Sequence, residues 1–365
     1  MQSRLLLALI GLMLLNGQLE TILTADETQT QPLLGSGKVQ LTAIMNEGGA
    51  PIDTDISWEI LSKPDAEGHR RSVAQSYDPQ PNLIVPAGKF LVKVKVGDTQ
   101  TTADIEVTPG QTTIKTLSLG AGRLTLTALA ATGGNPLTRD LSWEILSSSR
   151  EDDQRDQIAS SDDAQPTFTL PANPYLISVK WGETVVNQTV ELTAGKQLQT
   201  QIILNAGSLI PTATMTDGAA PATTDLSWEV LGQPNAEGDR PSLGASNDAQ
   251  PQFHLAAGRY LVKLVRGPLR AQQEIEVIAG QTAALTLNLN GGTLQLHATQ
   301  DGSWEIFGPL INGERQVLTY SYDKDFKTFV PVGNLLVVRH RNDDKIEQQV
   351  EIKANALSEL TLDVK

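Results

Sequence analysis

Four near-copies of one short segment constrain this chain more than any other feature. The segment Ser57–Leu61 reads Ser-Trp-Glu-Ile-Leu, and close versions of it return at 142–146, 227–231 and 303–307. Its tryptophan recurs at intervals of 85, 85 and 76 residues, at Trp58, Trp143, Trp228 and Trp304. Self-similarity at a fixed period is the signature of a tandem array in which each copy is one structural unit. The sequence therefore predicts four consecutive domains.

Short joints between the copies give the expected boundaries. Two or three small residues separate the end of one copy from the start of the next, as in Leu119-Gly120-Ala121-Gly122. The expected domains are residues 37–121, 122–206, 207–291 and 292–365. Because such joints permit bending but not free separation, we expect a rod or gently curved string with neighbouring domains in contact. The last copy lacks about nine residues before its tryptophan, which predicts a shortened, capping domain.

Each copy carries the pattern of antiparallel β-structure. Apolar and polar residues alternate in Val39–Ala43, and most strongly in Lys89–Val96, which is the period of a strand with one buried face. Turn residues such as Pro64 and Gly68 interrupt these runs, and no stretch of the copy has helical periodicity. About seven short strands per copy predict two packed antiparallel sheets.

An apolar segment lies near the start of the chain. Leu5–Leu15 follows a single positive charge at Arg4, and its eleven residues match a signal peptide and fall short of a bilayer span. We expect residues 1–25 to be an export signal and residues 26–36 a linker. The alternative is an uncleaved membrane anchor, although it would place Asn16 and Glu20 in lipid.

Composition excludes several classes of function. The formal net charge is −14, with 28 basic and 42 acidic residues, and no basic cluster is present, so nucleic acid is not an expected partner. The chain has no cysteine, which excludes disulfides, cysteine zinc sites and thiol chemistry. Aromatic residues make up only 4% of the chain, so a tryptophan that recurs in every copy is expected at the centre of each core.

Candidate chemistry is sparse. The four histidines occupy unrelated positions of the repeat and lack metal-ligand spacing: His69, His254, His297 and His340. No serine or threonine beside a histidine suggests a catalytic triad, and no glycine loop suits a phosphate. We therefore predict no enzyme activity, no cofactor and no metal site. The acidic runs Asp53–Asp55, Glu151–Asp153 and Asp162–Asp163 are expected to be solvated surface charge, with calcium as the alternative.

Two charged residues recur with each tryptophan. A glutamate follows it directly and an arginine comes 11 or 12 residues after it, giving the pairs Glu59 and Arg70, Glu144 and Arg155, Glu229 and Arg240, and Glu305 and Arg315. We expect an internal ion pair that braces a turn. The alternative is a charged groove that binds a ligand once per copy.

Trp181 is the one tryptophan outside this pattern. It aligns with Val96, Arg266 and Arg341 at the end of the strongest strand, directly before Gly182. An exposed tryptophan there is a candidate contact for a protein partner or a sugar. The alternative is that it caps its own core or packs against a neighbouring copy.

The second half of each copy resembles a known module. Pro86–Val94, taken with Val107–Gln111, is similar to carboxypeptidase-regulatory-like or transthyretin-like domains, and to repeats that accompany von Willebrand type A domains in bacterial exported proteins. The resemblance implies a seven-stranded Greek-key β-sandwich and a non-catalytic envelope or surface module. The expected fold is thus all-β, with four tandem Ig-like or transthyretin-like sandwiches, the last one shortened, arranged in a rod.

These features together predict an exported, non-catalytic structural or protein-interaction protein of the bacterial cell envelope, acting as a rigid spacer or scaffold. Its expected location is the periplasm or the cell surface, and its expected partners are envelope proteins. Contact with a membrane is expected only through an uncleaved N-terminal segment. The alternative function is a carbohydrate-binding or adhesin-like array.

Overall fold

The computed structural model describes residues 35–148 and 155–363. The expected export signal, and the linker up to residue 34, lie outside these ranges. The described residues form 28 β-strands and no helix, so none of them supplies an apolar helix that could cross a membrane. The all-β prediction is confirmed.

Each repeat consists of seven strands in the same order. The first contains β1 (Ser36–Ile44), β2 (Ile56–Leu61), β3 (Ser72–Ser76), β4 (Asn82–Pro86), β5 (Gly88–Val96), β6 (Thr99–Val107) and β7 (Thr112–Ser118). The second contains β8 (Ala121–Leu129), β9 (Leu141–Ser147), β10 (Gln157–Ser161), β11 (Thr167–Pro171), β12 (Pro174–Trp181), β13 (Thr184–Glu191) and β14 (Gln197–Ile203). The third contains β15 (Ala206–Thr214), β16 (Ser227–Leu231), β17 (Ser242–Ser246), β18 (Phe253–Ala256), β19 (Gly258–Arg266), β20 (Leu269–Val277) and β21 (Thr282–Asn288). The fourth contains β22 (Gly291–His297), β23 (Ser303–Phe307), β24 (Val317–Ser321), β25 (Asp325–Pro331), β26 (Gly333–Arg341), β27 (Asp344–Ile352) and β28 (Leu357–Thr361).

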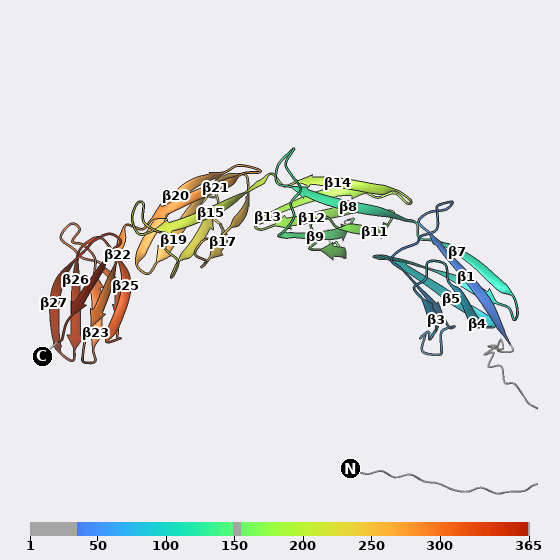
Figure 1. The fold of residues 1–365 in the computed structure, drawn as a ribbon, viewed down its shortest axis with the longest axis horizontal. Helices are drawn as coiled ribbons and strands as arrows, with labels where there is room; N and C mark the ends of the chain where they lie inside the picture. The colour runs from blue at the N-terminus through green and yellow to red at the C-terminus, as the bar shows by residue number, and fades with distance from the viewer. Residues whose placement is uncertain (1–34, 149–154, 364–365) are drawn as a thin grey trace, which may run out of the picture.

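The seven strands form two sheets with the same pairing in every repeat. In the first repeat, β1 lies between β4 and β7, antiparallel to β4 and parallel to β7. The second sheet has the order β3-β2-β5-β6. Each repeat therefore closes its own sandwich, and Figure 1 shows the four sandwiches following one another along an arch.

Alternation along the strands builds the core of each sandwich. In β1, Val39, Leu41 and Ala43 point inward and are at most 1% exposed, while the residues between them face outward. The sixth strand starts earlier than the apolar pattern of Ala103–Val107 suggests, because β6 pairs with β5 from the turn onward, beginning with Val96 opposite Thr99. Its first four residues, Thr99–Thr102, are three threonines and a glutamine, which extend the hairpin without adding to the apolar signal.

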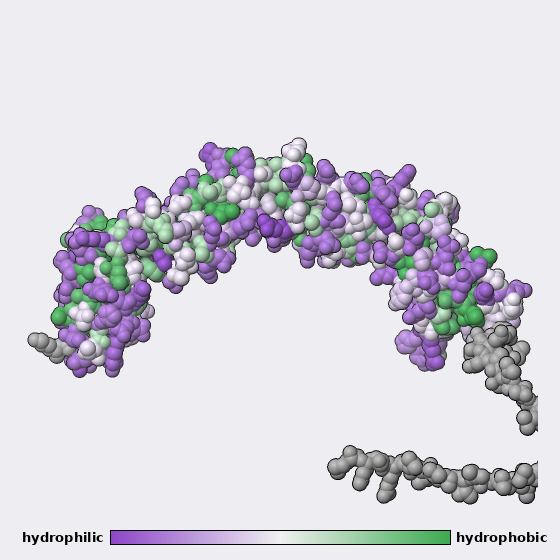
Figure 2. Space-filling view, viewed as in Figure 1, coloured by the Kyte–Doolittle hydropathy of each residue, from purple (hydrophilic) through white to green (hydrophobic). Residues whose placement is uncertain are grey.

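Backbone hydrogen bonds fix each joint. The Leu119 N–H donates to the Ile44 carbonyl at 2.9 Å, and the Ala121 N–H donates to the Met45 carbonyl at 2.9 Å, so β7 continues directly into β8. The matched bonds recur at the second joint (Leu204 to Leu129, Ala206 to Ala130) and the third joint (Leu289 to Thr214, Gly291 to Met215). The joint residues are therefore part of the sheets, which keeps neighbouring repeats at set angles. The surface of the arch is mostly hydrophilic (Figure 2).

The fourth repeat buries an arginine where the others bury an apolar residue. Each recurring tryptophan pairs with one residue on the neighbouring fifth strand of its sheet. That residue is Val94, Val179 and Leu264 in the first three repeats and Arg339 in the fourth. Those three repeats also have a longer segment after the first strand, which folds back through the bridges Ile44↔Pro51, Leu129↔Pro136 and Thr214↔Pro221. The long side chain of Arg339 lies in the repeat that lacks this segment.

Arg339 is incompletely paired. It is 2% exposed, its guanidinium carbon lies 4.5 Å from the centroid of the Trp304 ring, and Nη2 donates to the Gln300 carbonyl. Nη1 is buried and has no hydrogen-bond acceptor among the described residues. Burial lowers the pKa of Arg339, and Asp363 and Asp301 counter part of that shift. The fourth core thus carries a desolvated charge.

Replacing this charge should stabilise the fourth repeat. We expect Arg339→Leu, which introduces the residue that the third repeat has at this position, to raise the free energy of unfolding by about 1 kcal/mol. The measurement is urea denaturation of the full chain. Arg339→Lys keeps the charge and loses the planar contact with Trp304, so it should not stabilise. A lower midpoint for Arg339→Leu than for wild type would contradict the prediction.

Candidate functional site

The recurring tryptophans lie inside the sandwiches. Trp58 is 2% exposed and the other three are 0% exposed, and each belongs to the core cluster of its own repeat. No exposed aromatic face remains on these four residues for a ligand. Their role in the structure is packing.

A recurring turn that the sequence analysis missed anchors these tryptophans. In the second repeat, the Asp163 N–H donates to Ser161 Oγ at 3.1 Å, and the Trp143 Nε1–H donates to the Asp163 carbonyl at 3.0 Å. The third and fourth repeats have the same indole bond, from Trp228 to Asp248 and from Trp304 to Asp323. The signal was present in the sequence as Ser-x-Asp, 17 or 18 residues after each tryptophan.

The first repeat departs from this arrangement. Ser76 and Asp78 form the same turn, with the Asp78 N–H donating to Ser76 Oγ at 3.1 Å. The buried Trp58 Nε1, however, has no hydrogen-bond acceptor among the described residues. The turn after β3 therefore lacks the indole hydrogen bond that anchors the matching turn in the other three repeats.

The structure corrects the expected ion pairs. Among the described residues, none of the four arginines pairs with the glutamate that follows the tryptophan of its repeat. Each instead donates Nη1 to a carbonyl at the end of the second strand: Arg70 to Ser62, Arg155 to Ser147, Arg240 to Gly232, and Arg315 to Gly308. The Glu59 position is three residues before Ser62, about 10 Å along an extended strand, and this separation explains the error.

The glutamates have other neighbours. Glu59 Oε1 accepts from Gln75 Nε2 at 3.4 Å, and Glu305 Oε2 lies 3.0 Å from His340 Nε2. Arg240 forms an ion pair with a residue of β20, where its Nη2 lies 2.8 Å from Glu274 Oε1. These are surface contacts that brace strands, each worth about 0 to 1 kcal/mol. They do not form a groove that repeats along the array.

Trp181 lies in a joint and not on the surface. It is 6% exposed, and its ring stacks on His254 of the next repeat with centroids 3.9 Å apart and an interplanar angle of 18°. This corrects its assignment as a candidate partner contact. The carbohydrate hypothesis also rested on this residue, and its ring is not accessible to a sugar.

The three joints share one mode of docking. We call the two-residue turn between the fifth and sixth strands of a repeat its tip. At the first joint, Thr99 beside the tip donates Oγ1 to the Thr169 carbonyl at 2.8 Å. At the second, the tip residue Glu183 donates its N–H to the His254 carbonyl at 3.0 Å. At the third, the Arg266 guanidinium lies 3.5 Å from the centroid of the Phe329 ring.

The second joint brings a serine, a histidine and an aspartate together. Ser208 Oγ lies 3.0 Å from His254 Nδ1, and Asp140 Oδ2 lies 3.7 Å from His254 Nε2. Asp140, Ser208 and His254 are far apart along the chain, so no local spacing in the sequence indicates this group. Ser208 and His254 are 7% and 9% exposed and Trp181 covers the imidazole, so a substrate cannot reach Ser208 Oγ. The three residues hold the joint.

The second joint should be sensitive to pH. Burial lowers the pKa of His254 below its ordinary value of 6.5, although Asp140 counters part of the shift. The docked state therefore favours neutral imidazole, and its stabilisation is complete above pH 6.5 and decreases as the pH falls below that value. We expect the melting midpoint to fall more between pH 7.5 and pH 5.5 in wild type than in His254→Phe, which keeps the stacking. Equal falls would contradict this.

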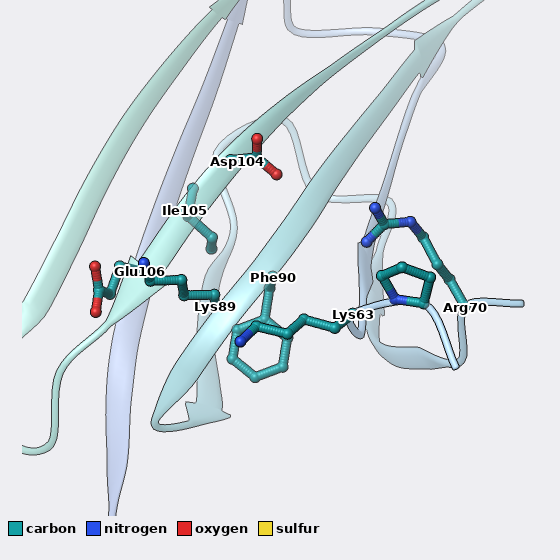
Figure 3. Close-up of a pocket in the computed structure, with 8 residues that line it drawn as sticks. Lys63, Arg70, Lys89, Phe90, Asp104, Ile105 and Glu106 are labelled. Atoms are coloured by element: carbon teal, nitrogen blue, oxygen red, sulfur yellow. The ribbon is translucent and has the colours of Figure 1, made fainter. Parts of the chain in front are cut away.

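Several clefts open on the surface of the first repeat. One, of about 450 Å³, is lined by Lys63, Arg70, Lys89, Phe90 and Asp104, among others. Figure 3 shows Lys63 extending from the loop after β2 across Phe90, with Asp104, Ile105 and Glu106 on β6. The lining includes no histidine, serine or cysteine, so it offers binding charges but no nucleophile paired with a base.

A second cleft surrounds an exposed tyrosine. It has a volume of about 620 Å³, its lining includes Asp53, Tyr77 and Lys95, and the Tyr77 ring is 80% exposed.

Among the described residues, no group of three or more histidine, aspartate or glutamate side chains could hold a metal ion. The acidic run 151–153 lies outside those residues.

Comparisons with known proteins find only distant structural likeness. No protein-family model and no curated protein matches the chain. Among solved structures, the chain is similar to the TIE protein of Bacillus anthracis, at 13% identity and a TM-score of 0.21, covering 92% of this chain and 75% of that one. It is also similar to GBS52, the minor pilin of Streptococcus agalactiae, at 12% identity and a TM-score of 0.26, covering 46% of this chain and 94% of that one. A streptococcal ancillary pilin is similar at 10% identity and a TM-score of 0.27, covering 69% of this chain and 98% of that one. Since all three TM-scores lie below 0.5, the fold assignment rests on the chain's own sheet pairing.

Proposed function

We propose that this chain is an exported, non-catalytic structural protein of the cell envelope, acting as an arched spacer that presents its repeats to protein partners. The observation that carries the proposal is the set of three docked joints. In each, the joint residues pair within the sheets, and contacts from the tip region of one repeat reach a strand of the next. Such an array keeps its two ends at a set separation.

Export is part of the proposal and rests on the apolar run Leu5–Leu15. The sandwiches that we propose as domains are residues 37–121, 122–206, 207–291 and 292–365, of the carboxypeptidase-regulatory-like or transthyretin-like type. The absence of catalysis is supported by the inaccessible Ser208 and by clefts that lack a nucleophile paired with a base. The partner is expected to be a protein of the envelope.

The test is an affinity capture of envelope proteins with the full chain, combined with small-angle scattering. The proposal predicts an arched particle with little flexibility, together with a captured protein that binds the purified chain directly. A flexible string of independent domains would contradict the spacer. A carbohydrate-binding array stays the second candidate because of the exposed Tyr77 in its cleft. Glycan-array binding that Tyr77→Ala abolishes would favour that candidate.

A further inference from the structure

One surface position on the fourth strand of each repeat marks where the preceding repeat docks. This position pairs across the sheet with a residue of the first strand, and its occupants are Ile84, Thr169, His254 and Phe329. Thr169 and His254 are buried by the repeat that precedes them. Phe329 packs against the core cluster of the third repeat. Three of the four positions are therefore covered by another repeat.

The remaining position, Ile84 on β4 of the first repeat, is exposed to solvent. No described repeat precedes it, and its side chain is 66% exposed. Ile114 on β7 lies on the same outer sheet face and is 71% exposed, whereas the matched residues of the other repeats are Gln199, Ala284 and Glu359. Figure 2 shows hydrophobic surface on the first repeat near the point where the chain enters it. The docking surface is thus present, and more apolar, at the start of the array.

The matching tip is present at the other end. The fourth tip, Asn342 and Asp343, joins β26 to β27 and is exposed. Its first residue has a φ of 52°, and the first residues of the three docked tips have values of 54°, 58° and 57° (Gly97, Gly182 and Gly267). Asparagine adopts this left-handed conformation more readily than most residues other than glycine. The fourth tip therefore keeps the backbone conformation of a docked tip.

The charges of the two ends are complementary. Lys38 lies beside Ile84 on β1 and is exposed, while Asp343 and Asp344 are exposed at the fourth tip. At the first joint, the positions of Lys38 and Asp343 are occupied by Arg123 and Asp98. The same arrangement of a basic first strand and an acidic tip is thus already used once within the chain.

We propose that the β4 face of the first repeat, built from Ile84, Ile114 and Lys38, docks the fourth tip of a second copy of this chain. The contact is heterologous, because each copy offers a tip at one end and a strand at the other, so it generates open strings of copies. This goes beyond the proposed function, since a single copy also forms a spacer.

The contact should be weak in free solution. Within the chain, each joint forms between tethered repeats, at an effective concentration of about 1 mM. Between chains, the same docking needs protein at roughly that concentration, or copies held side by side on a surface. The fourth repeat lacks the segment after its first strand that, at the first joint, places Asn46 against Gly195, so only the tip contact is available.

The test is sedimentation equilibrium of the full chain from about 10 μM to about 1 mM, the range in which a contact of this kind associates. Wild type should shift from one chain toward two or more with rising concentration. Ile84→Asp, which removes the strand surface, and the double change Asp343→Lys and Asp344→Lys, which reverses the tip charge, should each remain monomeric. Both act on exposed residues, and circular dichroism checks that the fold is retained.

An equimolar mixture of the two variants discriminates further. Each has one intact end, so the mixture should form dimers and nothing longer. A monomeric wild type at about 1 mM, or association of Ile84→Asp equal to wild type, would overturn the proposal. So would association that appears only when residues 1–34 are deleted, because the chain's own N-terminal segment would then be the occupant of the Ile84 surface.

Discussion

Replacing Trp58 with alanine should lower the free energy of unfolding of the first repeat by about 3 to 5 kcal/mol. Trp58 is 2% exposed, and it lies in a cluster with Val39, Leu41 and Val92 from both sheets. The truncation leaves a large cavity between those sheets, because the surrounding strands are hydrogen-bonded and cannot close it. A domain of this size has a total stability of only about 5 to 15 kcal/mol, so the loss is a large part of it.

The measurement is hydrogen exchange of the full chain, followed by mass spectrometry. Peptides from β1 to β7 should exchange faster in Trp58→Ala, while peptides from the third and fourth repeats stay protected. Unchanged protection of the first repeat would contradict the prediction.

A matched pair of variants separates packing from hydrogen bonding. Trp143→Phe removes the indole bond to the Asp163 carbonyl, whereas Trp58→Phe removes no such bond, because Trp58 Nε1 has no acceptor. Trp143→Phe should therefore cost about 1 kcal/mol more than Trp58→Phe. Equal costs would show that the indole bond contributes nothing to stability.

Trp181→Ala should open the second joint and destabilise it by about 2 to 4 kcal/mol. The ring is buried by its own repeat on one side and stacked on His254 on the other. Its removal takes away the stacking contact between the second and third repeats, leaving the Glu183 N–H bond to the His254 carbonyl and the Asp140 carboxylate 3.7 Å from His254 Nε2. The two repeats should then sample a wide range of angles, because the remaining contact is small.

The cysteine-free chain allows this to be measured directly. Spin labels on Asp162→Cys and Asn247→Cys, two exposed matched positions, report the distance between the second and third repeats by pulsed electron resonance. Trp181→Ala should broaden the distance distribution relative to the doubly labelled parent. Val185→Ala, an exposed residue of the same hairpin, should leave the distribution unchanged and alter stability by less than about 0.5 kcal/mol. A narrow distribution in Trp181→Ala would show that backbone pairing alone sets the joint.

Much of the architecture could be predicted from the sequence because local patterns determine it. The 85-residue period, the alternation in β1 and β5, and the turn residues between strands predicted four all-β sandwiches with a shortened last copy. The exception within a strand was the start of β6, where threonines pair with β5 without an apolar signal.

The side-chain contacts were less predictable, because they depend on where loops and repeats meet. The recurring glutamates and arginines share a period, yet the distance along the strand separates them, and each arginine bonds a carbonyl nearer to it. Nothing near His254 in the sequence indicates that Trp181 covers it or that Ser208 bonds it.

By itself, the sequence determined the number of repeats, the strand content and the presence of one tryptophan per core, because each follows from a period that a single copy already contains. Only the tertiary structure decided that Trp181 belongs to a joint, that Arg339 is buried, and that Ile84 is exposed while the matched Thr169 and His254 are buried. These properties depend on contacts between segments that are distant in the chain or belong to neighbouring repeats. The residue types at these positions change from repeat to repeat, so no local pattern predicts which partners they meet.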